Sequence, residues 1–246
     1  MEHSAYLDMA AVEERHWWFA GRRRVLKAII GRLGLKQNAA ILELGSGTGG
    51  NFMFLSDFGQ VTAVEMNETA RGISRSRPGA ADVHAGMLPD DLPLGDRKFD
   101  LVCMFDVLEH VEDDAGALRA ARAHLAPKGV LLLTVPAYQA LFGPHDEALH
   151  HKRRYEAAGL RARLQEAGLR VERLSFANAA LLPVAWVLRW LDKLLQRQQA
   201  TGSAVPAAPV NALLAAVFGA EAWILPHVSL PFGLSLIAVA RADDCE

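Results

Sequence analysis

The chain has 246 residues, of which 51% are hydrophobic and 22% charged, so it is long enough to bury a large core. Its formal net charge of −2 supplies no basic field for nucleic acid, and we expect no nucleic-acid partner. The two cysteines, Cys103 and Cys245, form neither a disulfide framework nor a metal-ligand cluster. The first residues lack the apolar core of a signal peptide, and no apolar run reaches the ~20 residues of a membrane span. We therefore expect a cytoplasmic protein without a transmembrane segment.

Short apolar runs alternate with helical patterns from residue 39 onward. This alternation predicts a parallel sheet with helices on both faces. Strands are expected at Ala39–Leu44, Gln60–Glu65, Ala81–His84, Phe99–Met104 and Gly129–Val135, and helices at Gly49–Asp57, Asn67–Arg77 and Glu112–Leu125.

The two ends of the chain differ from this alternating core. The first 38 residues form an amphipathic helical lead-in, with Gly34 as the expected helix end. Further along, a helix is expected at Tyr155–Ala167, and strands at Leu169–Ala177 and Leu234–Ala240. The sequence thus predicts an N-terminal helical lid (1–38), a central domain (39–178 and 232–246) and a helical insertion (179–231).

The insertion is rich in Leu, Ala and Trp, and small residues and prolines near 200–209 divide it into two helical pieces. It could serve as a homodimer interface, a cap over the acceptor, or an interfacial membrane element. Its apolar residues recur at helical spacing, namely Leu181, Leu182, Ala185, Leu188, Leu191 and Leu195. Trp186, Trp190 and Trp223 leave a peripheral membrane contact open, although burial in the core or in a dimer is favoured.

A glycine-rich loop, E-L-G-S-G-T-G-G (residues 43–50), follows the first apolar run. Its glycines fit both the dinucleotide pattern G-x-G-x-x-G and the pattern G-x-G-x-G. Glycines in a strand-to-helix turn let the backbone approach a ligand without a Cβ in the way. Glu43 ends an otherwise apolar strand, where a cationic ligand would suit it, because an unpaired buried carboxylate is costly. Glu65 ends the next strand, where a carboxylate accepts hydrogen bonds from ribose hydroxyls.

Three segments in order resemble the successive motifs of class I S-adenosylmethionine-dependent methyltransferases. They are E-L-G-S-G-T-G, V-T-A-V-E and F-D-L-V-C-M-F-D-V-L-E-H-V, and the resemblance covers about residues 39–175 and 232–241. It implies a Rossmann-like, seven-stranded, mostly parallel sheet whose one antiparallel strand lies near the C-terminus. It also implies S-adenosyl-L-methionine as the cofactor.

The resemblance further implies a set of cofactor contacts. Glu43 would lie near the methionine ammonium group, directly or through water, and Glu65 would hold the ribose. The full implied set is Glu43, Gly45, Ser46, Gly47, Glu65, Met66, Met87, Leu88, Phe105 and Asp106. In H-A-G-M-L-P, Met87 stands where the family segment G-D-A-x-x-L-P often has an Asp for the adenine amino group. A thioether packs on a ring but holds an amine poorly, so main-chain groups and apolar neighbours are expected to recognise adenine.

Four histidines follow the expected fourth and fifth strands, where parallel sheets bind their ligands. They are His110, His145, His150 and His151. A methyl acceptor usually loses a proton as the methyl group leaves sulfur, and His titrates near neutral pH. The cluster therefore supplies candidate catalytic bases, and the sequence leaves open which of them acts.

Two segments that pair aromatic with basic residues are candidates for acceptor binding. They are E-R-H-W-W-F-A-G-R-R-R (14–24) and H-K-R-R-Y (151–155), and both resemble segments of a bacterial branch of the superfamily that acts on glycans, lipids or secondary metabolites. The candidate residues are His16, Trp17, Trp18, Tyr138, Arg153, Arg154 and Tyr155. Guanidinium forks favour an anionic acceptor. The alternative is that the aromatics pin a helix to the core while the arginines are solvated. If both segments bind acceptor, they should meet near Gly45.

The sequence therefore indicates a methyltransferase acting on an oxygen or nitrogen of a small-molecule, glycan or lipid-type acceptor, with no metal required. A rival interpretation is a cofactor-binding regulatory protein without transferase activity. An NAD-dependent dehydrogenase is less favoured, because the chain ends in two strands joined by an insertion rather than in further strand–helix units.

Overall fold

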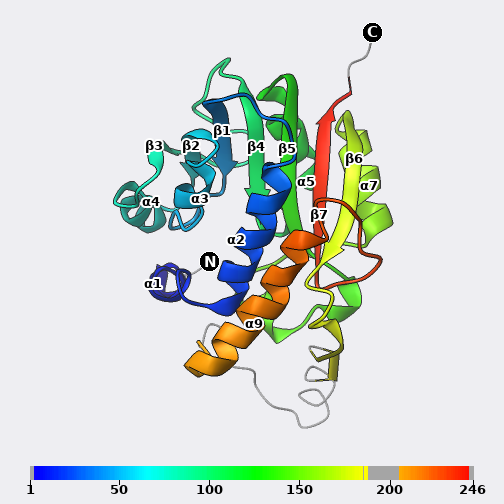
Figure 1. Ribbon diagram of the computed structural model, residues 1–246. Helices are drawn as coiled ribbons and strands as arrows, with labels where there is room; N and C mark the ends of the chain where they lie inside the picture. The colour runs from blue at the N-terminus through cyan, green and yellow to red at the C-terminus, as the bar shows by residue number, and fades with distance from the viewer. Residues whose placement is uncertain (1–2, 185, 188–204, 244–246) are drawn as a thin grey trace.

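The computed structural model describes residues 3–184, 186–187 and 205–243 of the chain (Figure 1). Its strands are β1 (Ala39–Leu44), β2 (Gly59–Glu65), β3 (Ala80–Ala85), β4 (Phe99–Phe105), β5 (Leu125–Pro136), β6 (Leu169–Ala177) and β7 (Ser235–Ala242). Its helices are α1 (His3–Val12), α2 (Trp17–Ile30), α3 (Phe52–Leu55), α4 (Glu68–Arg75), α5 (Asp114–Ala123), α6 (Pro144–Ala148), α7 (Ala157–Glu166) and α9 (Ala208–Ala220). Short 3₁₀ turns lie at Leu108–His110 (η1), Gln139–Leu141 (η2) and Glu221–Trp223 (η3).

The seven strands form one sheet in the order β3-β2-β1-β4-β5-β7-β6. β1 pairs in parallel with both β2 and β4, whereas β7 runs antiparallel to its two neighbours, β5 and β6. The expected Rossmann-like sheet with its antiparallel strand near the C-terminus is confirmed. The strand order reverses between β1 and β4, and in open α/β sheets ligands bind at such a switch point.

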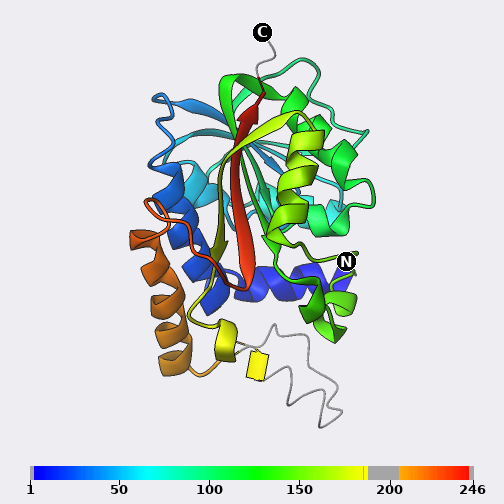
Figure 2. The same ribbon diagram turned by 90° about the vertical axis from the view of Figure 1, so that its right-hand side faces the viewer.

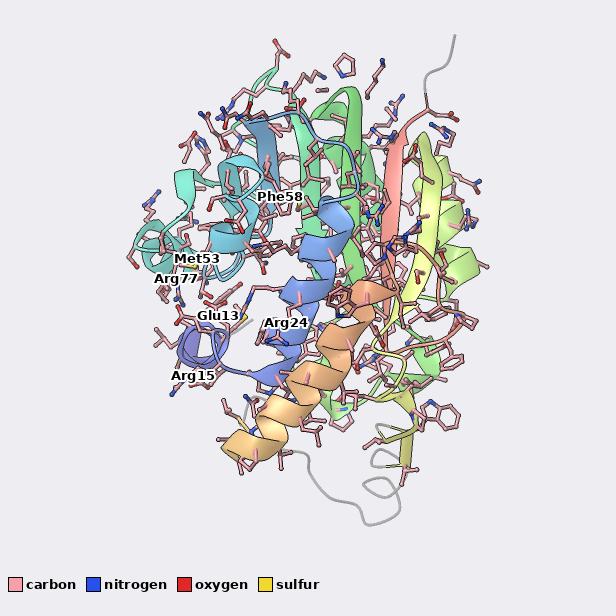
Figure 3. The ribbon with its side chains drawn as sticks, in the orientation of Figure 1. Glu13, Arg15, Arg24, Met53, Phe58 and Arg77 are labelled. Carbon is pink, nitrogen blue, oxygen red and sulfur yellow. The ribbon has the colours of Figure 1, made fainter. Side chains whose placement is uncertain are left out.

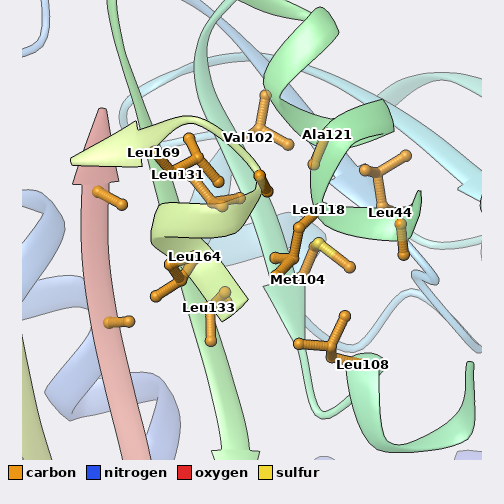
Figure 4. Close-up of a cluster of buried hydrophobic side chains, with 14 of the residues drawn as sticks. Leu44, Val102, Met104, Leu108, Leu118, Ala121, Leu131, Leu133, Leu164 and Leu169 are labelled. Carbon is orange, nitrogen blue, oxygen red and sulfur yellow. The ribbon is translucent and has the colours of Figure 1, made fainter. Parts of the chain in front are cut away.

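Helices cover the sheet on both faces. α5 and α7 lie on one face, where Leu118 and Leu164 pack against Leu131 and Leu133 of the sheet (Figure 4). On the other face, α2 and α9 lie side by side (Figures 1 and 2). The apolar positions of α2 explain its place: Val25, Leu26, Ile29 and Ile30 recur at helical spacing and are all buried. α2 is therefore a core helix for most of its length, and only its first turns face the ligand end of the sheet.

The helices expected at 67–77, 112–125 and 155–167 begin and end within two residues of the expected bounds, whereas two other helices differ more. The helix expected at Gly49–Asp57 is reduced to the single turn α3, because Gly49 adopts φ +82°, which no right-handed helix contains. The lead-in helix α2 ends at Ile30, with Gly31 as its C-cap, rather than at Gly34.

The insertion packs on the lead-in helix. A Cβ added at Gly21 of α2 would lie 2.6 Å from the Phe218 ring of α9, so the two helices approach closely where glycine removes the side chain. Trp223 follows α9 and is 84% exposed, and Trp186 is 58% exposed, so neither tryptophan is buried in the core. Burial in a dimer, the other possibility favoured from the sequence, stays a prediction. The predictions that concern Ala185, Leu188, Trp190, Leu191 and Leu195 lie outside the described residues. None of the described helices combines the length and the apolar character that a bilayer span requires.

Candidate active site

A cavity of about 1370 Å³ opens at the carboxyl ends of β1, β2 and β4. Its wall combines the loops after these strands with the α1–α2 junction and with the segment after β5. This volume exceeds the roughly 300–1,000 Å³ of an ordinary small-molecule pocket. The cavity can therefore hold a cofactor and a second ligand together.

One part of the wall, which we call the glycine-loop side, consists of residues 44–47, 50–51 and 64–66. Gly45 and Gly47 adopt φ values of +69° and +54°, a left-handed conformation that glycine tolerates at least cost. The Gly45 amide donates to the Val64 carbonyl at 2.8 Å, which ties the loop to β2. A Cβ at Gly45 would lie 2.6 Å from Val107 Cγ2. The loop thus needs glycine both for its backbone conformation and for its close contact with the β4 loop.

Glu65 joins this loop to the end of β2. Its buried carboxylate accepts hydrogen bonds from the Gly47 amide at 2.9 Å and from the Asn67 amide at 2.8 Å. The Ser46 hydroxyl also lines the cavity and is buried with no hydrogen-bond partner among the described residues. A polar ligand at this position satisfies Ser46 and uses the remaining lone pairs of Glu65. These residues fit the ribose and methionine portions of S-adenosylmethionine.

Glu43 does not line the cavity. It is 1% exposed, and Asn51 Nδ2 donates to its Oε1 at 2.7 Å, while Oε2 has no hydrogen-bond partner among the described residues. Burial raises the pKa of Glu43 to about 8, against the opposing effect of the Asn51 hydrogen bond. Asn51 itself lines the cavity, so Glu43 lies behind Asn51 and does not face the cavity directly.

The other residues implied as cofactor contacts all line the cavity. They are Met66, Met87, Leu88, Phe105 and Asp106. Asp106 forms an ion pair with Arg22 of α2, and the Arg22 guanidinium lies 4.6 Å from the Trp18 ring centroid. Arg22 was not among the predicted site residues. Its four-residue spacing from Trp18 on a helix is the sequence signal that places the two on one face.

Glu13, at the α1–α2 junction, connects the N-terminal segment to the glycine loop through a hydrogen bond. Its buried carboxylate accepts from the Thr48 hydroxyl and from Arg77, each at 2.7 Å (Figure 3). A Cβ at Gly50 would lie 2.3 Å from Glu13 Oε2. The junction therefore sits directly on the loop.

The other part of the wall, which we call the histidine side, consists of residues 109–113, 145, 148–152 and 154. All four predicted histidines line it, namely His110, His145, His150 and His151. The ring centroids of His110 and His151 are 4.7 Å apart, and their planes meet at 82°. Burial and the neighbouring His151 lower the pKa of His110 to about 4, so His110 is neutral and weakly basic.

Asp146 binds two side chains of the histidine side. Its buried carboxylate pairs with His151 Nδ1 at 2.9 Å and with Arg154 Nε at 2.8 Å. Those two partners hold the pKa of Asp146 well below its usual range. Arg154 also donates to the Ala137 carbonyl at 3.3 Å. Arg154 lines the cavity as expected, but its guanidinium is engaged in orienting Asp146 and, through it, His151.

Three predicted acceptor residues do not line the cavity. Tyr138 stacks on Phe176 with ring centroids 5.3 Å apart. Arg153 pairs with Asp114 at 3.1 Å, and the buried Tyr155 hydroxyl lies 3.1 Å from the same carboxylate. Their aromatic and basic character serves packing and ion pairing, so their positions do not support acceptor contact.

The remaining predicted acceptor residues, His16, Trp17 and Trp18, line the cavity. His16 also accepts a hydrogen bond from the Trp18 amide and so caps α2. The N-terminal segment and the segment after β5 therefore reach the same cavity as Gly45, as expected if both border the acceptor.

Glu109 completes the histidine side and was not among the predicted site residues. It is fully buried, and neither carboxylate oxygen has a hydrogen-bond partner among the described residues. Burial, with a further contribution from Asp106, raises the pKa of Glu109 well above its usual range. One oxygen of Glu109 and one ring nitrogen each of His110 and His151 all lie within 4.8 Å of one another. The sequence showed Glu109 and His110 as neighbours but gave no sign that His151 joins them.

The fold and the glycine loop are those of class I methyltransferases. A family model for the methyltransferase domain matches residues 18–174, and the chain belongs to this family. The family implies S-adenosyl-L-methionine as the cofactor.

Curated relatives carry the same description. A protein of Mycolicibacterium smegmatis described as a probable S-adenosylmethionine-dependent methyltransferase is 30% identical over 162 residues, which are 65% of this chain and 62% of the relative. The chain thus spans less than two thirds of that relative's length. A ubiquinone biosynthesis O-methyltransferase of Xanthomonas euvesicatoria is 30% identical over 200 residues, 70% of this chain and 83% of the relative.

A solved structure shows the same fold. A chain of the complex that contains the Haloferax volcanii Trm112 methyltransferase activator superposes with a TM-score of 0.64 and 18% identity. The match covers 99% of this chain and 96% of that one.

Proposed function

We propose that the protein is an S-adenosylmethionine-dependent methyltransferase that acts on an oxygen or nitrogen of a small-molecule, glycan or lipid-type acceptor. The observation that carries the proposal is one cavity of about 1370 Å³ whose two sides differ in chemistry. The glycine-loop side offers a carboxylate and main-chain groups suited to a cofactor. The histidine side offers groups that hold or move a proton.

On the glycine-loop side, Glu65 would accept hydrogen bonds from the ribose hydroxyls, and Ser46 would meet the methionine portion. Asn51, held by Glu43 at 2.7 Å, would present its amide toward the same end. Met87 and Leu88 would pack on the adenine ring. When bound, S-adenosylmethionine supplies an electrophilic methyl group, and these residues contribute by fixing its direction toward the histidine side.

On the histidine side, the acceptor proton must leave as the new bond to carbon forms. His110 is a poor proton acceptor near neutral pH because its pKa is lowered to about 4. His145, His150 and His151 remain as candidate bases. His151 has its Nδ1 directed by Asp146 at 2.9 Å, an arrangement that orients a ring for proton transfer through its Nε2.

The acceptor would enter beside Trp17, Trp18 and Phe19, which together with Arg23 and Lys152 line the cavity. Aromatic faces beside cationic groups suit an acceptor that carries a ring or apolar chain and a negative charge. An oxygen acceptor gains support from the Xanthomonas relative, whose name specifies O-methylation. Glycan or lipid biosynthesis and secondary metabolism are the settings that we propose.

Calorimetry with S-adenosylhomocysteine and with NAD, followed by turnover assays, tests the proposal. We expect S-adenosylhomocysteine to bind and NAD to give no heat. We also expect release of S-adenosylhomocysteine from S-adenosylmethionine with at least one member of a panel of phenols, sugar acids, lipid headgroups and amines. Binding without turnover on any member would favour a regulatory cofactor-binding protein. Tight NAD binding without S-adenosylhomocysteine binding would overturn the proposal.

A further inference from the structure

A buried carboxylate and two imidazoles converge on the histidine side. Glu109 and His110 come from η1, directly after β4, and His151 comes from the segment after β5. One ligand-type atom from each lies within 4.8 Å of the other two, and all three residues line the cavity. Residues about forty positions apart in the chain thus meet at one point of the cavity wall.

The Glu109 side chain lacks a partner that would explain its burial. It is 0% exposed, and neither oxygen accepts a hydrogen bond from another described residue. Two arginines lie nearby, but Arg22 pairs with Asp106 and Arg154 pairs with Asp146, and neither donates a hydrogen bond to Glu109. A buried carboxylate without a partner costs several kcal/mol in a protein interior. Burial therefore keeps Glu109 protonated, and a cation between Glu109 and the imidazoles would stabilise the ionised form.

The two histidines are arranged as metal ligands commonly are. His151 Nδ1 is occupied by Asp146 at 2.9 Å, which leaves Nε2 as its free ligand atom. Metal-bound histidines almost always use their second nitrogen in this way, with a carboxylate or carbonyl that fixes ring and tautomer. Arg154 in turn holds Asp146 at 2.8 Å, so the orientation of His151 is built into the buried structure. The His110 ring stands at 82° to the His151 ring, so the two rings do not stack and each can direct a nitrogen to a shared point.

We propose that Glu109, His110 and His151 bind one divalent transition-metal ion at the acceptor end of the cavity. Two imidazoles with one carboxylate are the donor set of open zinc and non-haem iron sites, whereas Mg²⁺ and Ca²⁺ prefer oxygen ligands alone. Ligands bound at about 2.1 Å to one tetrahedral ion lie about 3.4 Å apart. Binding would therefore require rotations of the Glu109 and His110 side chains that shorten the present spacing of up to 4.8 Å.

Three protein ligands leave at least one coordination position open toward the cavity. An acceptor oxygen in that position would be held in place, and the ion would favour its deprotonated form. His110 and His151 would then act as ligands, and the proton would pass to His145, to His150 or to water. This role of the ion depends on the proposed methyl transfer, whereas metal binding itself does not.

Titration of the tag-free protein after chelator dialysis tests the site. We expect wild type to bind one equivalent of Zn²⁺ or Mn²⁺ by calorimetry, with a rise in Tm, and to give a Co²⁺ absorption band typical of bound imidazole. Loss of a supporting residue around a metal typically costs ten- to a hundredfold in affinity. Glu109→Gln, which keeps the shape of the side chain, should therefore weaken binding by about a hundredfold or more, and His151→Gln likewise.

His145→Gln is the matched control, because His145 lines the same cavity outside the proposed ligand set. It should leave metal affinity within a few-fold of wild type. Wild type that takes up no divalent ion at millimolar concentration overturns the proposal. So does a His145→Gln variant that loses as much affinity as Glu109→Gln, or metal binding that persists in a folded Glu109→Gln/His151→Gln variant.

S-adenosylhomocysteine calorimetry on the same proteins separates this proposal from the proposed function. Metal binding with the expected pattern, in a protein that binds no S-adenosylhomocysteine, supports the site and refutes the methyltransferase function. S-adenosylhomocysteine binding and turnover in a protein that takes up no metal refute the site and support the function.

Discussion

The two sides of the cavity are built by different means. On the glycine-loop side the main chain does most of the work: Gly45 and Gly47 adopt positive φ angles, and the loop amides donate to β2. On the histidine side, buried ionisable side chains dominate: Asp146 lies between His151 and Arg154, and Glu109 has no hydrogen-bond partner in the described part of the chain. A site built from main-chain groups can be recognised from short local sequence motifs. A site built from side chains depends on which segments, distant in the sequence, lie together in the fold. The two sides should therefore respond differently to substitution.

The largest effect is expected on the histidine side. Arg154→Ala removes a partner of the buried Asp146 carboxylate, and breaking a buried ion pair typically costs about 3–5 kcal/mol of stability. We expect a loss of that size in the free energy of unfolding, measured with urea. Lys27→Ala removes an exposed pair with Asp57 and should cost at most about 1 kcal/mol. Equal losses in the two variants would show that burial does not set the strength of these pairs.

The next effect concerns the glycine-loop side. Glu65→Ala removes the carboxylate placed for the ribose hydroxyls, and hydrogen bonds to a charged group are worth about 1.5–3 kcal/mol. The dissociation constant for S-adenosylhomocysteine should rise roughly ten- to a hundredfold. Because Glu65 also accepts from Gly47 and Asn67, Tm should be recorded alongside the calorimetry. An unchanged constant in a folded variant would mean that the ribose is held elsewhere.

Glu43 links stability to pH. Its pKa is raised by burial from 4.5 to about 8, so the folded state holds the proton more tightly than the unfolded state. The stability that this proton contributes is fully present below pH 4.5 and is lost as pH rises toward 8. The slope is at most about 1.4 kcal/mol per pH unit. Glu43→Gln should flatten urea-unfolding stability across this window, whereas Glu68→Gln, on the surface, should follow wild type. Parallel profiles for wild type and Glu43→Gln would contradict the shift.

The sheet and the glycine-loop side could be predicted from the sequence because their signals are local. The run Leu169–Ala177 has the same bounds in the structure as expected, and every implied cofactor residue except Glu43 lines the cavity. Glu43 does not line the cavity, and strand alternation does not reveal that Asn51, eight residues later, donates to its carboxylate; its place near the ammonium group stays a prediction.

The histidine side could be predicted only in part. The four histidines were found by their positions after strands, but their partners were not. Nothing in the sequence indicates that Glu109 and Asp146 are buried, since η1 and the short helix α6 that carry them are too short to show a periodic pattern. Tyr155 and Arg153 were expected at the acceptor because the H-K-R-R-Y run shows which residue types are present. It does not show toward which part of the structure each side chain points. In the structure Asp114 of α5 binds both.

The smallest effect on cofactor affinity is expected for Trp18, which lines the cavity and contacts the Arg22 guanidinium at 4.6 Å. Trp18→Ala removes a cation–π contact worth about 0.5–1 kcal/mol and loosens the Arg22–Asp106 pair at the end of β4. Turnover should therefore fall roughly two- to fivefold. The dissociation constant for S-adenosylhomocysteine should rise by no more than about fivefold. Trp18→Phe keeps an aromatic face for Arg22 and should recover part of the turnover. Trp223→Ala, at an exposed position, should change neither quantity. If Trp18→Ala instead weakened S-adenosylhomocysteine as much as Glu65→Ala does and left turnover at saturating cofactor unchanged, Trp18 would belong to the cofactor site.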